Sequence, residues 1–111
     1  MEKEDLSELT PEKKVQNSIV DFFKGLEKDG LPVKCFRREA GGFAYKKGLP
    51  DLYACVNGYH VEIEVKRKGG KLSTMQEKWR DKFISMNVRW FCFDNIDDCR
   101  KEILNILEEK K

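Results

Sequence analysis

The chain has 111 residues, of which 38% are charged, 40% apolar and 11% aromatic, and its net charge is +2. This length and apolar content fit one compact domain, and so weak a net charge does not by itself indicate a nucleic-acid partner. The apolar runs are too short to span a bilayer, and the charged N-terminus lacks the apolar region of a signal peptide. We therefore expect an intracellular protein without a membrane partner.

The N-terminal third predicts a helix followed by a strand. Residues 1–9 are polar and are expected to be flexible. Thr10 and Pro11 suit the start of a helix, and apolar residues recur at helical spacing over 15–26. A strand follows over 31–39, and its later part is basic.

The middle of the chain predicts a β-hairpin. A glycine-containing basic loop over 40–48 leads into an apolar strand over 51–56. Asn57-Gly58 is a strong signal for a two-residue hairpin turn, and the return strand covers 59–66. Alternation places two sets of side chains on opposite faces of the return strand: Val61, Ile63 and Val65 on one, and Glu62, Glu64 and Lys66 on the other.

The last third predicts a helix, a strand and a final helix. Ser73 and Gln76 match a capping box that opens the first of these helices, whose expected core stripe is Met75, Trp79, Phe83 and Met86. The apolar strand over 88–93 is expected to be central in the sheet, and Asp94-Asn95 caps the last helix. Because a helix connects the third and fourth strands, these two should be parallel. The fold class is therefore α/β, a mixed four-stranded sheet flanked by helices in the order αβββαβα.

The cysteines do not indicate a structural zinc site. None of the four forms a Cys-x-x-Cys pair, and the single histidine, His60, has no cysteine at ligand spacing. Three of the thiols lie in apolar strand-like runs and are expected to pack as small hydrophobes, in agreement with a reducing compartment. These three are Cys35, Cys55 and Cys92.

Asp51, Glu64 and Lys66 have the clearest chemistry. Glu64 and Lys66 leave the same face of one strand, and counting back from the turn places Asp51 opposite Glu64, about 4.5–5.5 Å away between β-carbons. Two carboxylates at this separation repel unless a cation lies between them. Mg²⁺ suits them, because it prefers oxygen ligands and accepts phosphate oxygens. Lys66 would stabilise charge on a phosphate or position a water molecule, which predicts phosphodiester hydrolysis.

Three motifs extend this pattern: Gly48-Leu49-Pro50-Asp51-Leu52, Glu64-Val65-Lys66-Arg67, and Lys71-Leu72-Ser73 followed by Gln76 and Trp79. Together with the element order, they resemble the VRR-NUC family of the PD-(D/E)xK nuclease superfamily, over roughly residues 10 to 95. The resemblance implies a restriction-endonuclease-like core and a single nuclease domain over 10–111. It also implies Mg²⁺ as the cofactor, with Mn²⁺ able to substitute and no organic cofactor.

The resemblance also assigns individual roles. Asp51 and Glu64 would be metal ligands, with the Val65 backbone carbonyl as a third, and Lys66 would be the catalytic lysine. Two further candidates are Glu12, which matches a first-helix glutamate, and Gln76, which matches a helix glutamine near the site. Gln76 has a competing role in the capping box with Ser73, and one side chain is not expected to satisfy both roles fully.

Simpler interpretations compete with these assignments. Glu64 and Lys66 can be a solvated strand face with a surface ion pair, although Asp51 and the element order favour a site. Glu62 shares their face but has no lysine two residues later, so we expect it to be exposed or to lie behind the ligands. His60, beside the turn, is expected to be exposed rather than a general base.

Basic residues fall in three segments that should flank the carboxylates. Scattered lysines often serve only solubility, but this grouping suits contacts with a phosphate backbone. The predicted DNA-binding residues are Arg37, Arg38, Lys46, Lys47, Arg67, Lys68 and Lys71.

These features predict a Mg²⁺-dependent endonuclease for branched DNA, such as four-way (Holliday) junctions or flaps. Symmetric cutting of a four-way junction needs two active sites, so a homodimer is expected, as in the resolvase-like members of the family. The compartment would be the cytoplasm of a bacterial or phage-infected cell. The alternatives are a nucleic-acid-binding accessory subunit of the same fold that does not cut, and an interaction protein whose charges serve only solvation.

Overall fold

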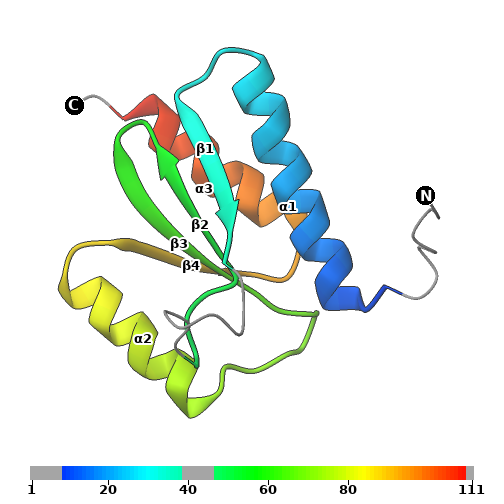
Figure 1. Ribbon diagram of the computed structural model, residues 1–111, viewed down its shortest axis with the longest axis vertical. Coiled ribbons are helices and arrows are strands. Elements are labelled where there is room, and N and C mark those ends of the chain that lie inside the picture. Colours follow the sequence, from blue (N-terminus) through cyan, green and yellow to red (C-terminus); the bar gives the residue numbers. More distant parts are fainter. Residues whose placement is uncertain (1–8, 39–46, 110–111) are drawn as a thin grey trace.

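The computed structural model describes residues 9–38 and 47–109, which form a four-stranded sheet with helices on both faces (Figure 1). The predictions for residues 1–8, for most of the loop over 40–48 and for Lys46 lie outside the described residues. The elements are α1 (Pro11–Lys28), β1 (Val33–Arg37), β2 (Leu52–Val56), β3 (Tyr59–Val65), α2 (Thr74–Ser85), β4 (Arg89–Phe93) and α3 (Ile96–Glu108). This order confirms the predicted one.

The sheet is mixed and its strands follow one another in chain order, β1-β2-β3-β4. β1 and β3 each pair antiparallel with β2, and β4 pairs parallel with β3, as the helical crossover predicts. In the β2–β3 turn, Asn57 and Gly58 have φ angles of 53° and 83°, which Asn and Gly tolerate best. The register pairs Leu52 with Ile63. The neighbouring Asp51 therefore comes level with Glu64 at the open end of the hairpin.

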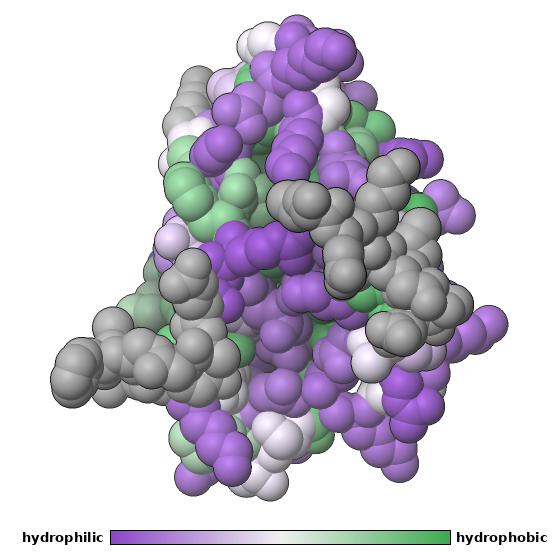
Figure 2. All heavy atoms as spheres, turned by 45° about the vertical axis from the view of Figure 1, so that its right-hand side comes forward, coloured by the Kyte–Doolittle hydropathy of each residue, from purple (hydrophilic) through white to green (hydrophobic). Residues whose placement is uncertain are grey.

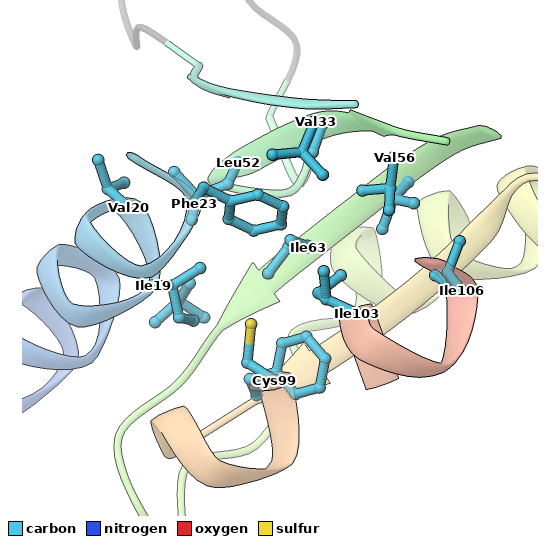
Figure 3. Packing of buried hydrophobic residues seen from close by; sticks show 14 residues of the cluster. Ile19, Val20, Phe23, Val33, Leu52, Val56, Ile63, Cys99, Ile103 and Ile106 are labelled. Atoms are coloured by element: carbon cyan, nitrogen blue, oxygen red, sulfur yellow. The ribbon is translucent and has the colours of Figure 1, made fainter. Parts of the chain in front are cut away.

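The core lies between the sheet and the pair of helices α1 and α3. Figure 3 shows Phe23 and Ile19 of α1 and Ile103 and Cys99 of α3 meeting over Ile63 of β3. All five side chains are almost completely buried. The opposite face of the sheet carries Glu62 and Glu64, and α2 packs over its β4 edge. The two sides of the sheet therefore differ, with an apolar side that stabilises the fold and a side that bears carboxylates.

β4 lies at the edge of the sheet, so the prediction that it is central is wrong. It is apolar because helices contact both of its faces, α3 on the core side and α2 on the other. Phe93 is buried, but Cys92 is exposed, as is Cys55 of β2. The expectation that these two thiols pack as small hydrophobes is also wrong, because their side chains point away from the core.

The predicted core stripe of α2 is only partly buried. Phe83 is buried, whereas Met75 and Met86 are 39% and 48% exposed. The helix packs over the β4 edge of the sheet. The sheet therefore covers only part of the apolar row of α2. Part of the apolar surface of α2 is therefore exposed.

Within the described ranges, none of the helices has the length and apolar character that crossing a membrane requires.

Candidate metal centre

Three carboxylates meet at the open end of the hairpin. Glu12 from the first turn of α1, Asp51 just before β2 and Glu64 near the end of β3 each offer an oxygen, and these oxygens all lie within 4.8 Å of one another. The Asp51 Oδ2 atom also accepts a hydrogen bond of 3.1 Å from the Val65 backbone N–H. This bond fixes the Asp51 carboxylate across the end of β3, beside Glu64.

Glu64 is the buried member of this cluster and is only 2% exposed. Its Oε1 atom accepts a hydrogen bond of 2.9 Å from Gln76 Nε2, but Oε2 has no hydrogen-bond partner among the described residues. Burial raises the pKa of Glu64 to about 8, and the neighbouring Asp51 adds to the rise, while Lys66 opposes it. A buried carboxylate oxygen without a partner is unfavourable, so the site favours either a proton or a cation at this atom. The all-oxygen donor set fits a hard divalent cation such as Mg²⁺.

The pKa of Glu64 leads to a prediction about stability. Between about pH 4.5, its ordinary pKa, and about pH 8 the folded metal-free chain retains a proton that the unfolded chain releases. The free energy of unfolding should therefore fall as the pH rises through this window, in total by something on the order of 5 kcal/mol. Urea unfolding in EDTA at several pH values measures this. The difference from Glu64→Gln isolates the contribution of this carboxyl, and parallel curves for the two proteins would contradict the expectation.

Gln76 both completes the capping box of α2 and contacts the carboxylate cluster. The Gln76 Oε1 atom accepts a hydrogen bond from the Ser73 backbone N–H at 2.8 Å. The Gln76 backbone N–H donates to Ser73 Oγ at 3.2 Å, which completes the capping box. The other end of the same carboxamide, Nε2, donates to Glu64. Contrary to the expectation, one side chain makes both sets of hydrogen bonds, because an amide has an acceptor and a donor that point in different directions. The start of α2 is thereby tied to the carboxylate cluster.

Gly48 explains why the segment before Asp51 can approach α2 so closely. Its φ angle is +91°, which favours glycine. A Cβ atom at this position would lie 2.7 Å from Met75 Cβ, closer than real Cβ contacts allow. The glycine in the Gly-Leu-Pro-Asp motif therefore has a packing role, because it lets the chain that carries Asp51 press against the first turn of α2.

Behind the carboxylate cluster lies a buried ion pair between Arg38 and Glu62. Of the two positions expected for Glu62, exposed or behind the ligands, the structure shows the second, because Glu62 is completely buried. Arg38 donates to both of its carboxylate oxygens, at 2.8 and 3.2 Å, and to the Pro50 carbonyl at 2.8 Å. The Arg38 backbone N–H donates to the Asp51 carbonyl at 2.9 Å. His60 is half-exposed, as expected, and its Nε2 lies 2.6 Å from Glu62. The pair therefore anchors the backbone that carries Asp51.

Removing one partner of this pair should cost much of the stability. Arg38→Ala leaves the Glu62 carboxylate buried without its main counter-charge, so we expect the free energy of unfolding to fall by about 3–5 kcal/mol. Arg37→Ala is the matched control, because the Arg37 guanidinium bonds to Gln16 and Asn17 on the surface and should contribute about 1 kcal/mol or less. Denaturant unfolding compares the two variants, and equal losses would argue against the buried pair as an anchor.

The predicted DNA-binding residues divide into two groups. Arg37 and Arg38 are bonded to other side chains, as described above. The remaining described ones are exposed and make no ion pair with any residue within 9–38 or 47–109: Lys47, Arg67, Lys68 and Lys71. Figure 2 shows that hydrophilic side chains dominate the middle of the face seen from the side of α1.

Comparisons with known proteins agree with the fold. No protein-family model and no curated protein matches the sequence. A solved structure described as "VRR_NUC domain" superimposes with a TM-score of 0.67, over 93% of this chain and 100% of that one, at 19% sequence identity. The chain therefore has the VRR-NUC type of restriction-endonuclease-like fold, which confirms the predicted fold class.

Proposed function

We propose that this protein is a metal-dependent endonuclease that hydrolyses phosphodiester bonds in branched DNA. The observation that carries the proposal is the buried Glu64 carboxylate, which has one oxygen without a partner. It lies close enough to the carboxylates of Asp51 and Glu12 for the three to share one cation. The fold likeness to a VRR_NUC domain supports it. A purely structural role offers no reason to bury a carboxyl group with one oxygen unpartnered at the open end of a hairpin.

The chain's own oxygens would hold the cation. Asp51 and Glu64 are the principal ligands that we propose, with the Val65 carbonyl and Glu12 as further candidates, and Mg²⁺ as the ion, with Mn²⁺ able to replace it. When bound, such an ion polarises a phosphoryl oxygen and makes a bound water more acidic. Gln76 keeps one Glu64 oxygen occupied, so that the unpartnered Oε2 atom is left for the cation.

Lys66 is the residue that we propose to act on the phosphate. It follows Glu64 by two residues, and its charge lowers the Glu64 pKa against the effects of burial and Asp51. Its ammonium group makes no ion pair with any of the described side chains. An unneutralised ammonium beside the carboxylates can stabilise the negative charge that grows on a phosphate in the transition state.

The DNA backbone would lie across the exposed basic residues near the site. Lys47 precedes Asp51, and Arg67, Lys68 and Lys71 follow Lys66 on the loop into α2. Unpaired cations of this kind give salt-dependent binding without sequence preference. Arg37, being exposed, can add a contact, whereas Arg38 is committed to Glu62.

We infer the assembly from the proposed substrate and the compartment from the cysteines. Symmetric cutting of a four-way junction takes two active sites, so we propose a C2 homodimer for such a substrate. The four cysteines are free, which suits the reducing cytoplasm of a bacterial or phage-infected cell.

A cleavage assay tests the function. Purified protein is incubated with linear, flap and four-way DNA in Mg²⁺ or Mn²⁺, beside the Glu64→Ala variant. We expect the wild type to cut a branched substrate and the variant to cut none. If the wild type binds DNA but cuts none of the three substrates, a non-catalytic accessory subunit of the same fold is the better description.

A further inference from the structure

The exposed surface of α2 has two faces of different character. On one face, Arg80 lies 3.9 Å from the Glu77 carboxylate and 3.0 Å from that of Asp81. The charges of this face therefore largely neutralise one another. Such a face serves solubility and needs no partner.

The other face combines an apolar surface with two unpaired cations. Met75, Lys78, Trp79 and Lys82 line a shallow groove of about 340 Å³, whose accessible surface is almost entirely apolar. Their spacing of three and four residues places them in one row along the helix. Neither lysine makes an ion pair with a residue of the described ranges.

The Trp79 ring is held in place within this groove. Its Nε1 atom donates to the Lys47 carbonyl at 3.2 Å, and the ring packs against Phe83, with 5.7 Å between the ring centroids. Trp79 remains only partly buried. A fixed and partly exposed aromatic ring is a suitable platform for a flat ligand, because little side-chain entropy is lost on binding.

The groove begins next to the carboxylate cluster. Met75, at its N-terminal end, precedes Gln76, whose side chain bonds to Glu64. In Figure 1, α2 runs away from this point, apart from α1 and α3. A DNA strand whose phosphate lies at the cluster can therefore continue along α2.

We propose that this groove binds an unpaired arm of the DNA substrate, with its bases on Met75 and Trp79 and its phosphates on Lys78 and Lys82. A duplex would engage only the lysines, because its base faces are stacked, whereas an apolar floor with a cationic rim is the pattern of single-strand sites. The inference rests on the proposed function and sharpens it. Of the branched substrates in the proposed function, the groove favours DNA with a single-stranded arm beside the cut, such as a flap, over a fully paired four-way junction. A flap needs a single cut, so this substrate does not require the homodimer that a four-way junction would.

Intrinsic fluorescence tests the groove without requiring cleavage. The chain has two tryptophans, so Trp90→Phe leaves Trp79 as the only reporter. The Trp90 Nε1 atom has no hydrogen-bond partner in the described part of the chain, so this replacement removes no bond. In EDTA, we expect oligothymidine to quench Trp79 and a blunt duplex of equal length to leave it almost unchanged.

The lysines are tested by a matched pair of variants. Lys78→Ala/Lys82→Ala should weaken oligothymidine binding and reduce the slope of log affinity against log salt by about one to two. Arg80→Ala, on the neutralised face of the same helix, should bind like the wild type. Equal effects of the double variant and Arg80→Ala would overturn the proposal.

Other outcomes identify a different occupant. If oligothymidine and duplex quench Trp79 equally, or neither does, the groove is not a single-strand site. If an acidic peptide quenches Trp79 but DNA does not, the occupant is a protein segment. If the double variant converts a dimer into a monomer, it is a second copy of the chain. Cleavage without quenching would refute single-strand binding in the groove and support the nuclease function. Quenching without cleavage of any substrate would support binding in the groove and refute the nuclease function.

Discussion

Replacing Lys66 with alanine is expected to lower the rate constant of DNA cleavage by about 10²–10³-fold and to leave DNA binding almost unchanged. The reason is that, in the role we propose, its ammonium group would stabilise charge that develops only in the transition state, and losing one such donor has an effect of this size. Its position two residues after Glu64, without an ion pair to any described residue, supports this role. Single-turnover cleavage and fluorescence anisotropy separate the two quantities.

The matched control for Lys66 is Lys68, an exposed lysine on the same loop. Lys68→Ala should weaken binding and reduce its salt dependence by about one phosphate contact, while the rate constant at saturating DNA stays the same. If Lys66→Ala lost binding and cleavage to the same extent, Lys66 would be a binding residue.

Replacing Glu64 with glutamine should have two opposite effects. Cleavage should fall by about 10³-fold or more, because losing the ion's electrostatic assistance removes several kcal/mol of transition-state stabilisation, and Mn²⁺ binding should weaken with it. The metal-free protein should become more stable near pH 8, since the buried charge is gone while an oxygen remains to accept from Gln76. Calorimetric Mn²⁺ titration and urea unfolding measure these changes.

Glu27→Gln is the control for this variant, because Glu27 lies in an exposed ion pair with Lys34. Such pairs contribute about 1 kcal/mol or less, so neither stability nor metal binding should change much. A loss of stability in Glu64→Gln at pH 8 together with normal Mn²⁺ affinity would mean that Glu64 is a structural residue.

The hairpin could be predicted from the sequence because its signals are local. Asn57-Gly58 sets the turn, and the two-residue period of a strand then fixes which side chains share a face. From these two facts alone, Asp51 comes level with Glu64, as the register shows. The same period could not predict that Glu62 and Glu64, on one face of the strand, have different partners. The partner that holds the buried Glu62 carboxylate is Arg38, which is 24 residues away and directly follows β1.

The errors at β4 and α2 have a common physical cause. Apolar side chains on both faces of β4 suggested a central strand, but helices on both faces give the same pattern at an edge. The apolar row of α2 suggested a wide core contact, yet Met75 and Met86 face outward. How much of an apolar surface is covered depends on packing between distant segments. The position of Glu12 beside Asp51 likewise depends on how α1 packs, and only the family resemblance indicated it.

The most direct test of this account is a crystal structure of the protein soaked in Mn²⁺, with the ion located by its anomalous scattering. We expect one or more ions between the carboxylates of Asp51 and Glu64, with Glu64 Oε2 as a ligand and the Val65 carbonyl beside it. An empty site, with Glu64 Oε2 hydrogen-bonded to a protein donor instead, would contradict the account.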